Sequence, residues 1–295
     1  MTNGDIAVLA NPAAGRGRHR DVLPGVLERL GHVRLLEAHT AEEAEKACRR
    51  AAGEGCAALV AVGGDGTMHL ALQAAAEAGV PFGVVPAGTG NDFAVCVGVP
   101  PHPLEAATAI AGALREGREH RVDLARTVGT DGETRWFGVV LAAGFDAIVN
   151  ERANRMRWPR GPRRYDLAIL LEMVRVRPRL YALELDGVDH GFEGTLVAVG
   201  NCPSYGGGLR IAPSADPADG LLDVVTAAPL SRADMARLKP RLRQGTHVTD
   251  PRVHTFRAKQ VRLHSDGIIA YADGERVGPL PLEITCVPAA LRLLR

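Results

Sequence analysis

A glycine-rich turn with a single acid, residues 63–67 (Gly-Gly-Asp-Gly-Thr), is the segment of the sequence best suited to chemistry. It lies between an apolar run, residues 57–62, and residues 68–77, which are good helix formers. Glycine lets the backbone approach a ligand closely, and a helix start presents unpaired N–H groups and a positive dipole end that suit phosphate. Because Asp65 would repel a bare phosphate, the turn indicates phosphoryl chemistry in which this carboxylate meets a cation, a sugar hydroxyl or a proton.

Two further loops have a similar character. Residues 11–17 (Asn-Pro-Ala-Ala-Gly-Arg-Gly) and residues 86–94 (Pro-Ala-Gly-Thr-Gly-Asn-Asp-Phe-Ala) each follow an expected strand. Residues 11–17 alone suit an ordinary turn as well as a nucleotide contact. Neither they nor residues 63–67 contain the Gly-Lys-Ser/Thr of a P-loop or the dinucleotide pattern G-x-G-x-x-G.

The elements that position these loops alternate between strand and helix. Strands are expected at residues 6–10, 33–38, 57–62 and 82–85, and helices at residues 21–30, 68–78 and 103–116. Thr40 and Glu43 form a capping box that begins another helix, which runs to about residue 52. This alternation predicts an α/β domain with a doubly wound parallel sheet. Ligands of such sheets bind at the carboxyl ends of the strands, where all three loops are expected.

The second half of the chain has a different rhythm. Short strand-like segments at residues 136–142, 180–185, 194–199, 221–227, 261–264 and 268–272 are separated by Gly, Pro or Asp turns. A single helix is expected among them, at residues 164–175. This spacing predicts a β-sandwich or a similar antiparallel domain.

Composition limits the class of protein. A chain of 295 residues with 46% hydrophobic and 23% charged residues fits two globular domains. The net charge of +1 argues against a nucleic acid as partner. Five scattered cysteines without C-x-x-C spacing are interpreted as reduced thiols, not as disulfides or zinc ligands. With no signal peptide and no apolar run long enough for a membrane span, we expect a cytoplasmic protein whose membrane contact is peripheral.

The three loops, in this order, resemble the diacylglycerol kinase catalytic family, which includes bacterial lipid kinases and sphingosine and ceramide kinases. Further matches follow in the family's order at residues 144–147 (Gly-Phe-Asp-Ala), Asn201, residues 206–208 (Gly-Gly-Gly), residues 213–223 and residues 273–275 (Asp-Gly-Glu). The resemblance implies ATP bound between an NAD kinase-like α/β domain, residues 1–124, and a β-sandwich domain for the lipid, residues 125–281. It also implies that residues 282–295 return to the first domain.

The resemblance also assigns site residues. Along the nucleotide it places Asn11, Pro12, Gly15, Gly17, Thr40, Gly63, Gly64, Asp65, Gly66, Thr67, Gly88, Thr89, Asn91 and Asp92. It links Asp65, Asp92 and Asp123 through water to Mg²⁺, and it assigns a second, structural Mg²⁺ to Asp216, Asp219 and the carbonyl group of Leu221. Glu275 is implied as the base that takes the proton of the lipid hydroxyl, with Asp273 supporting it or the metal.

From the residues alone, each acid also has a simpler interpretation. Asp92 fits an Asx turn or helix cap, Asp123 an exposed strand end, and Asp216 and Asp219 a turn with solvated acids. Asp273-Gly274 is a strong signal for a plain β-hairpin.

The function expected is an ATP-dependent lipid kinase of lipid metabolism and phospholipid biosynthesis, which transfers the γ-phosphoryl group to the hydroxyl of diacylglycerol or a related lipid. The alternatives are an NAD kinase-like enzyme and a catalytically weak lipid- or nucleotide-binding protein. The last is motivated by His69 and Leu70, which stand where the family usually has Asn and Glu. The expected partners are the lipid and the membrane surface, with a homodimer left open. Residues 152–164, with six arginines and no acids, suit either docking on anionic headgroups or a solvated face.

Overall fold

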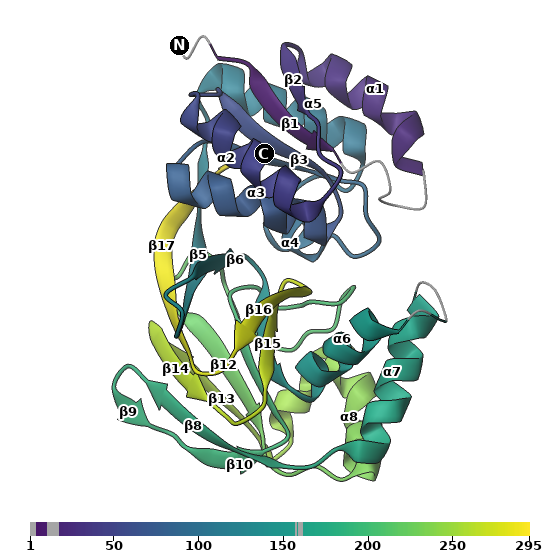
Figure 1. Cartoon of the computed structure of the whole chain (residues 1–295), viewed down its shortest axis with the longest axis vertical. Helices are drawn as coiled ribbons and strands as arrows, with labels where there is room; N and C mark the ends of the chain where they lie inside the picture. The colour runs from purple at the N-terminus through teal and green to yellow at the C-terminus, as the bar shows by residue number, and fades with distance from the viewer. Residues whose placement is uncertain (1–3, 11–17, 157, 159–161) are drawn as a thin grey trace.

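The computed structural model describes residues 4–10, 18–156, 158 and 162–295, which form an upper and a lower lobe in Figure 1. In the upper lobe, parallel strands lie in the order β4-β3-β1-β2. They are β1 (Ile6–Ala10), β2 (Val33–Leu36), β3 (Ala58–Gly63) and β4 (Phe82–Pro86). The helices are α1 (Arg18–Leu30), α2 (Ala41–Gly53), α3 (Asp65–Ala78), α4 (Asp92–Cys96) and α5 (Pro103–Glu116). The α2–α3 pair and the α1–α5 pair pack against the sheet and bury β3 along its whole length.

The local signals explain most helix boundaries. The Thr40 hydroxyl accepts a hydrogen bond from the N–H of Glu43 at 3.1 Å, as in the predicted capping box. The Glu43 carboxylate, however, accepts from the N–H of His39 at 2.8 Å, so the box closes one residue further out. Helix α3 begins at Asp65, three residues earlier than predicted, because Gly64 is its N-cap. Asp65 therefore lies in the first turn of the helix.

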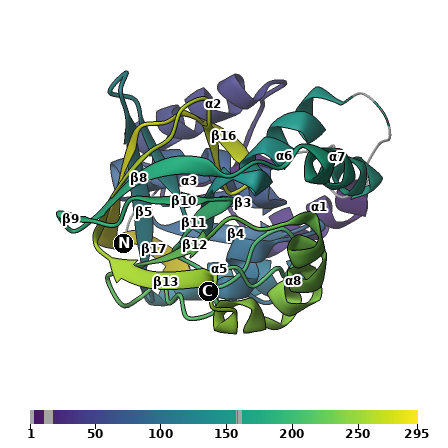
Figure 2. The same cartoon turned by 90° about the horizontal axis from the view of Figure 1, so that it is seen from below.

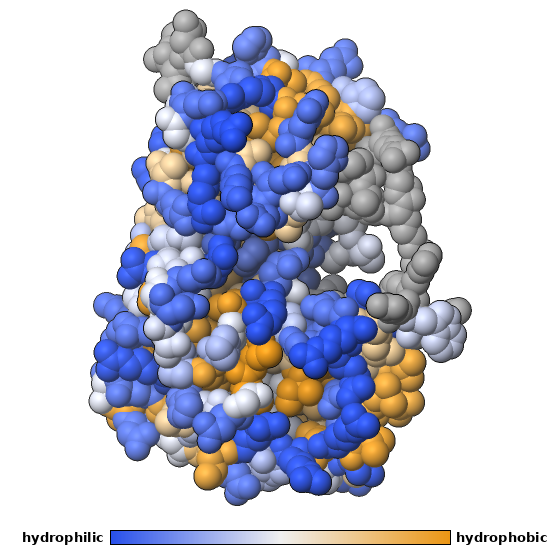
Figure 3. Space-filling view, in the orientation of Figure 1, coloured by the Kyte–Doolittle hydropathy of each residue, from blue (hydrophilic) through white to orange (hydrophobic). Residues whose placement is uncertain are grey.

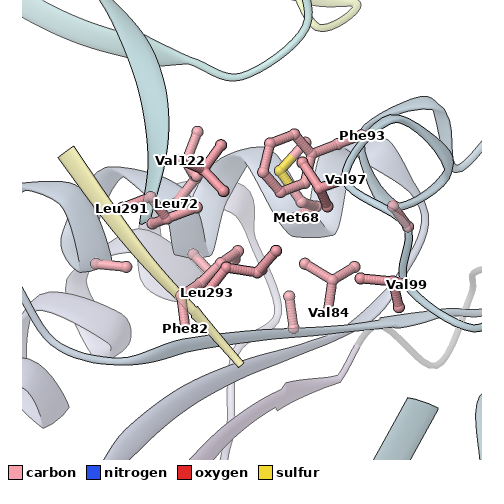
Figure 4. Close-up of a cluster of buried hydrophobic side chains, with 14 of the residues drawn as sticks. Met68, Leu72, Phe82, Val84, Phe93, Val97, Val99, Val122, Leu291 and Leu293 are labelled. Carbon is pink, nitrogen blue, oxygen red and sulfur yellow. The ribbon is translucent and has the colours of Figure 1, made fainter. Parts of the chain in front are cut away.

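The core of the upper lobe fixes the helices that carry the acidic residues (Figure 4). Met68 and Leu72 of α3 lie beside Phe82 and Val84 of β4, and Phe93 of α4 closes the same cluster. All of these side chains are almost fully buried. The starts of α3 and α4 are thus anchored by the packing of the residues that follow Asp65 and Asp92.

The lower lobe is a β-sandwich. One sheet has the strand order β13-β12-β11-β7-β15-β16, and the other contains β10, β8, β14, β17 and β5 with short flanking strands. The strands are β5 (His120–Gly129), β6 (Thr134–Phe137), β7 (Val140–Gly144), β8 (Arg179–Leu185), β9 (Val188–Asp189), β10 (Phe192–Gly194), β11 (Leu196–Gly200), β12 (Leu222–Ala227), β13 (Val253–Ala258), β14 (Gln260–His264), β15 (Ile269–Ala272), β16 (Glu275–Pro279) and β17 (Leu282–Leu294). A buried cluster that includes Leu141, Val199, Leu263 and Ile284 fills the space between the sheets. The predicted fold class is confirmed.

Strand β17 connects the two lobes. It pairs with β14 and β5 as an antiparallel strand in the lower lobe. Its last residues pair with β4 as a parallel strand, with Leu293 opposite Phe82. The register shifts between Val287 and Leu291, where the strand passes from one lobe to the other. Backbone hydrogen bonds therefore fix the position of one lobe against the other.

The lower lobe is more helical than the sequence predicts. The expected helix is α7 (Pro162–Arg175), but α6 (Phe145–Arg155), α8 (Arg232–Gln244) and the 3₁₀ turn Thr246–Thr249 are also present. Helix α8 has little apolar periodicity and contains Pro240, so its strongest local signal is the capping box between Ser231 and Asp234. No helix in the part of the chain that the structure describes has the length and apolar character needed to cross a membrane.

One interpretation of the cysteines is wrong. Cys96 at the end of α4 and Cys202 after β11 form a disulfide, with a Cα–Cα distance of 6.1 Å. The two residues are 106 positions apart in the chain, and spacing alone does not reveal that they meet in space. Cys48, Cys56 and Cys286 are free and buried, as expected. The disulfide joins the α4 end of the upper lobe to the lower lobe.

Candidate active site

The loops after β3 and β4 touch through their backbones. The N–H of Ala87 donates to the carbonyl group of Gly63 at 2.8 Å. A Cβ on Gly88 would lie 2.5 Å from the Cα of Gly64, so any larger residue would push the two loops apart. Two glycine-rich loops therefore form one continuous wall at the carboxyl ends of neighbouring parallel strands, where ligands of such sheets bind.

The start of α3 lies in this wall. No side chain caps the helix at Gly64, so the first N–H groups face outward from the helix start. Thr67 is buried in the first turn, and Thr89 is exposed at the tip of the neighbouring loop. Such a helix start attracts an anion through its N–H groups and its dipole.

Asp65 and Asp92 converge on Gly90. A Cβ on Gly90 would lie 2.8 Å from Oδ2 of Asp65 and 3.4 Å from Oδ2 of Asp92. The Asp65 carboxylate accepts a hydrogen bond from the N–H of Asn91 at 2.9 Å. Asn91 adopts a left-handed conformation, with φ 55°, and its side chain bonds back to Gly88. The helix cap proposed for Asp92 is therefore provided by Asn91 as N-cap residue, and the Asp92 carboxylate is directed elsewhere.

The Asp92 carboxylate reaches the lower lobe. It accepts the N–H groups of Gly207 at 3.0 Å and Gly208 at 3.2 Å. Gly206, Gly207 and Gly208 all have positive φ angles, which explains the run of glycines in this loop. Tyr205, just before them, donates its hydroxyl proton to Asp146 on α6 at 2.9 Å. Sequence analysis identified the glycines but missed this connection from α6 through Tyr205.

Burial sets the charge state of Asp65. Burial, which is the largest cause, and the negative charges of Asp92 and Asp273 together raise the pKa of this carboxyl to about 6, against the hydrogen bond from Asn91. Among the described residues, this carboxyl has no cationic partner that would stabilise its charged form. The described part of the site thus combines a positive helix start with a carboxyl that would gain from a nearby cation.

The Asp273-Gly274 turn is the part of the lower lobe that contributes acids to the candidate site. Both residues have positive φ angles, 53° and 84°, as the predicted hairpin between β15 and β16 requires. The Asp273 carboxylate is fully buried and accepts the successive N–H groups of residues 138–140, at 3.0, 2.9 and 3.3 Å. Asp273 is thereby held rigidly at the start of β7. The predicted hairpin is confirmed, and the catalytic roles assigned to Asp273 and Glu275 stay predictions.

Glu275 lies opposite the start of α3. It is exposed, and its Oε1 would be only 2.9 Å from a Cβ placed on Gly66. In Figure 1 the β15–β16 hairpin lies below α4, facing the upper lobe. The structure therefore brings Glu275 of the lower lobe to the first turn of α3, the helix that begins at Asp65.

His69 and Leu70, which depart from the family pattern, have separate roles. His69 Nδ1 lies 3.3 Å from Oδ2 of Asp273, and Gln73 on the next turn lies 3.4 Å from His69 Nε2. Leu70 packs on the apolar core of the upper lobe. His69 thus contacts the acid of the hairpin directly, a contact that the sequence did not predict.

Asp123 does not join the Asp65–Asp92 pair by direct contact. Its buried carboxylate accepts the N–H groups of Gly220 and Ala289, both at 2.7 Å. The side-chain amide of Asn201 donates to the Asp123 carbonyl at 2.9 Å. Asp123 therefore connects β5 to the bulge of β17 and to the loop before β12, and its predicted link to Mg²⁺ through water stays a prediction.

The Asp216–Asp219 segment forms a tight turn. The carboxylates accept the N–H groups of Ala218 and Leu221, at 3.1 and 3.0 Å, and both acids are exposed. The second oxygen of Asp219 pairs with Arg257. Among the described residues, no three His, Cys, Asp or Glu side chains lie close enough to hold a metal ion together. The segment therefore forms a turn with exposed acids, and its assignment to a second Mg²⁺ with the carbonyl group of Leu221 stays a prediction.

The other predicted nucleotide residues are only partly placed. Asn11, Pro12, Gly15 and Gly17 lie outside the described residues. The Thr40 hydroxyl caps α2. The nucleotide contacts assigned to these residues stay predictions.

The candidate site combines a helix start beside two glycine-rich loops, a group of acids and a facing hairpin. This arrangement is typical of a two-domain phosphotransferase with its site between the lobes. The sequence model of the diacylglycerol kinase catalytic domain matches residues 5–127, and that of the YegS C-terminal NAD kinase beta sandwich-like domain matches residues 138–295. The chain belongs to the diacylglycerol kinase family of lipid kinases.

Individual relatives agree with this assignment. The chain is 43% identical over 297 residues to a diacylglycerol kinase of Mycobacterium tuberculosis, covering 99% of this chain and 95% of the relative. It is 30% identical to a protein of Stenotrophomonas maltophilia named as a YegS-like lipid kinase, covering 85% and 82%. A crystal structure of a diacylglycerol kinase candidate from Bacillus anthracis superimposes with a TM-score of 0.80 at 21% identity, covering 100% and 96% of the two chains. The predicted family and the predicted enzyme class, a lipid kinase, are confirmed, and this kinase family implies ATP as co-substrate.

Proposed function

We propose that this protein transfers the γ-phosphoryl group of ATP to the free hydroxyl of diacylglycerol or a closely related lipid, with Mg²⁺ bound to the phosphates. The observation that carries the proposal is the position of Glu275 beside Gly66, because it brings a carboxylate of the lower lobe to the helix start that suits the phosphates. The relatives that are named diacylglycerol kinase support diacylglycerol as the acceptor class.

The residues fit Mg²⁺ at one of the two predicted places. Asp65 and Asp92 offer carboxylate oxygens near Gly90, and the raised pKa of Asp65 indicates that a cation would stabilise its charged form. Mg²⁺ is usually held by one or two carboxylates, water and substrate phosphates, which suits this pair. At Asp216 and Asp219 the fit is poorer, because Arg257 already neutralises the carboxylate of Asp219 and both acids are exposed to solvent.

The chain's own groups divide the work of phosphoryl transfer. The N–H groups at the start of α3 would orient the phosphates, with Asp65 and Asp92 holding the metal. Mg²⁺ supplies neutralisation of the phosphate charge. Oε1 of Glu275 would accept the proton of the lipid hydroxyl as the hydroxyl oxygen attacks the γ-phosphorus, while the bond from the γ-phosphorus to the bridging oxygen breaks and ADP leaves. Phosphoryl transfer depends mainly on positioning and charge, so an exposed carboxylate suffices as base.

Asp273 acts through Glu275. Its carboxylate is saturated by the N–H groups of residues 138–140 and contacts His69, so it is not free to take a substrate proton. Its role in this proposal is to hold the tight turn that presents Glu275 to α3. Among the predicted catalytic residues, Glu275 is thus the base and Asp273 its positioning residue.

The test is transfer of label from ATP with Mg²⁺ to separate panels of diacylglycerol, a sphingoid base, phosphatidylglycerol and NAD. Transfer to diacylglycerol, lost in Glu275→Gln and retained in Glu133→Gln, is the expected result. Glu133 is a matched control because it is an exposed glutamate in the turn before β6. Label on NAD alone would overturn the proposal in favour of an NAD kinase-like enzyme, and ATP binding without any transfer would favour the binding protein.

A further inference from the structure

Helix α7 is apolar on two faces. Its inner face packs on α6, where Ala168 and Ile169 meet Val149 and Ala153. Its outer face carries Leu170, Leu171 and Val174, which are 60%, 39% and 57% exposed. At about 100° per residue these three side chains lie within one arc of the helix surface. A surface helix normally has one apolar face, so the second one indicates a partner.

The apolar face is visible on the surface of the molecule. Figure 3 shows hydrophobic side chains at the lower right edge of the lower lobe, where Figure 1 places α7. Trp158, 77% exposed, precedes the helix in the chain. Tryptophan is enriched where protein meets the interface of a membrane, because its ring is apolar and its N–H is polar.

Positive charge is concentrated around this helix. Residues 152–179 contain nine arginines against two acids, Asp166 and Glu172, a net charge of +7 in a chain whose total is +1. The rest of the chain therefore carries a net charge of −6. Such asymmetry orients a protein in the field of a charged surface, with α7 toward negative charge.

Two exposed arginines beside the face lie outside the segment that the sequence favoured. Within residues 152–164, Arg152 pairs with Glu172 and Arg155 with Glu151, so these two carry little free charge. Arg175 and Arg177, at the C-terminal end of α7, are exposed and have no carboxylate partner within the described ranges. Arg232 of α8 adds a further positive charge there by donating to the carbonyl group of Val174.

The apolar face and the arginines beside it together indicate which kind of partner binds there. A second copy of the chain in a symmetric contact would place like charges opposite each other. A bilayer with anionic headgroups instead accepts the leucines and valine into its interfacial layer and pairs the arginines with lipid phosphates. An enzyme whose substrate has two acyl chains must also meet that substrate at a bilayer.

We infer that the outer face of α7 (Leu170, Leu171 and Val174), with Arg175 and Arg177 at its end, is the surface by which this protein seats on an anionic phospholipid bilayer. The inference rests on the proposed function for its purpose, though not for its test. It places the packed helices α6 and α7 against the membrane. The first turn of α6 carries Asp146, the acid that Tyr205 contacts. Lipid would then enter from the side of the lower lobe on which these helices lie (Figure 2).

The test is co-sedimentation of the full chain, without ATP, with vesicles of phosphatidylcholine alone or mixed with an equal amount of phosphatidylglycerol. The wild-type protein should bind the mixed vesicles and be released by salt. The double variant Leu170→Glu/Val174→Glu should bind on the order of tenfold or more weakly. Arg175→Gln/Arg177→Gln should lower binding to mixed vesicles by a similar factor, since each arginine contributes about fivefold.

The matched control is Leu35→Glu/Val188→Glu. It adds the same two charges at apolar residues that are 46% and 58% exposed, but Leu35 lies on β2 of the upper lobe and Val188 on β9, at the opposite side of the lower lobe from α7 (Figure 2). Equal binding of the α7 variant and the control would overturn the inference. So would a wild-type dimer that Leu170→Glu/Val174→Glu converts to a monomer in analytical ultracentrifugation, since a second copy would then cover the face.

A kinase assay with short-chain diacylglycerol in micelles separates this inference from the proposed function. The Leu170→Glu/Val174→Glu variant should phosphorylate the dispersed lipid at the wild-type rate while failing on vesicles. If no variant, wild type included, phosphorylates any lipid but vesicle binding still depends on α7, the substrate assignment is wrong and the docking surface stands. Equal loss of activity in micelles and on vesicles would contradict a docking role.

Discussion

Asp65 with Asp92 and Asp216 with Asp219 are two pairs of acids of the same composition in different surroundings. The first pair lies between glycine loops, where burial and neighbouring acids raise the pKa of Asp65 to about 6. The second pair is exposed in a turn, where backbone N–H groups and Arg257 compensate the charge. Both pairs matched metal sites of the family in sequence. Burial and counter-charge, which the motifs do not record, distinguish them.

The difference shows which acids lack a positive charge that would stabilise their ionised form. A carboxylate that pairs with a guanidinium, as that of Asp219 does, gains little from a metal, whereas one that lies beside other acids, as that of Asp65 does, gains a great deal. We therefore expect the first pair to take part in the chemistry and the second to support the loop that leads into β12. Four measurements break or sharpen this contrast.

The largest effect is expected for Asp65→Asn in the kinase reaction. The amide keeps the size of the side chain but removes the charge that would hold the cation, so kcat/KM should fall on the order of a thousandfold. Asp219→Asn, the matched control from the second pair, should stay within about threefold of wild type. Initial rates at saturating Mg²⁺ with diacylglycerol measure both. Full activity in Asp65→Asn would remove the distinction between the two pairs.

The stability of Asp65→Asn should depend on pH. The folded-state pKa, raised from an ordinary value of 3.8 to about 6, means that the folded protein binds a proton more tightly than the unfolded chain. Wild type therefore loses stability relative to the variant as the pH rises from about 4 through 6, by about 3 kcal/mol above pH 7. Denaturation with EDTA at pH 4.5 and 7.5 compares the two proteins. Equal wild-type and variant stabilities at pH 7.5 would contradict the burial of an unpaired charge.

The elements with strong local signals were predicted reliably from the sequence. Helix α5 and strand β1 begin and end where predicted, since Pro103 opens the helix, Gly117 ends it in a left-handed conformation, and residues 6–10 are a short apolar run. The β15–β16 turn followed from Asp273-Gly274. Helix α8 was missed because only its capping box marks it, and its apolar pattern is weak.

The contacts across the site were beyond sequence reasoning. Cys96 and Cys202, His69 and Asp273, and Asp92 and Gly207 each join the two lobes, whose relative position β17 helps to fix. No local pattern encodes such long-range contacts, and the chemical state of Asp65 depends on several of them at once. The motifs supplied the residues of the site, and tertiary packing supplied their partners.

The variant His69→Asn tests how strongly a third acid, Asp273, depends on its partner, for comparison with Asp65 and Asp92. Because Asp273 keeps the N–H groups of residues 138–140 as donors, loss of the 3.3 Å contact with His69 should lower kcat by no more than about tenfold. The KM for ATP should stay unchanged, since His69 faces Asp273 and Gln73. Steady-state kinetics measures both constants. Gln73→Leu is the matched comparison on the same face of α3.

A kcat in His69→Asn that falls as far as in Glu275→Gln would show that the histidine, and not the backbone cradle, holds the turn. A rise in the KM for ATP with kcat unchanged would instead place His69 at the nucleotide.

The smallest effect is expected for the second pair itself. The Asp219–Arg257 ion pair is partly exposed, with side chains 27% and 46% accessible, so Asp219→Asn should change the free energy of unfolding by less than about 1 kcal/mol. Its melting temperature should still rise with added Mg²⁺ as much as that of wild type, because we propose that the metal binds at Asp65 and Asp92. Thermal melts with and without Mg²⁺ give both quantities for Asp219→Asn and Asp65→Asn. If the Mg²⁺ response disappears in Asp219→Asn and persists in Asp65→Asn, the ion pair with Arg257 opens to admit a metal, and the contrast between the two pairs is reversed.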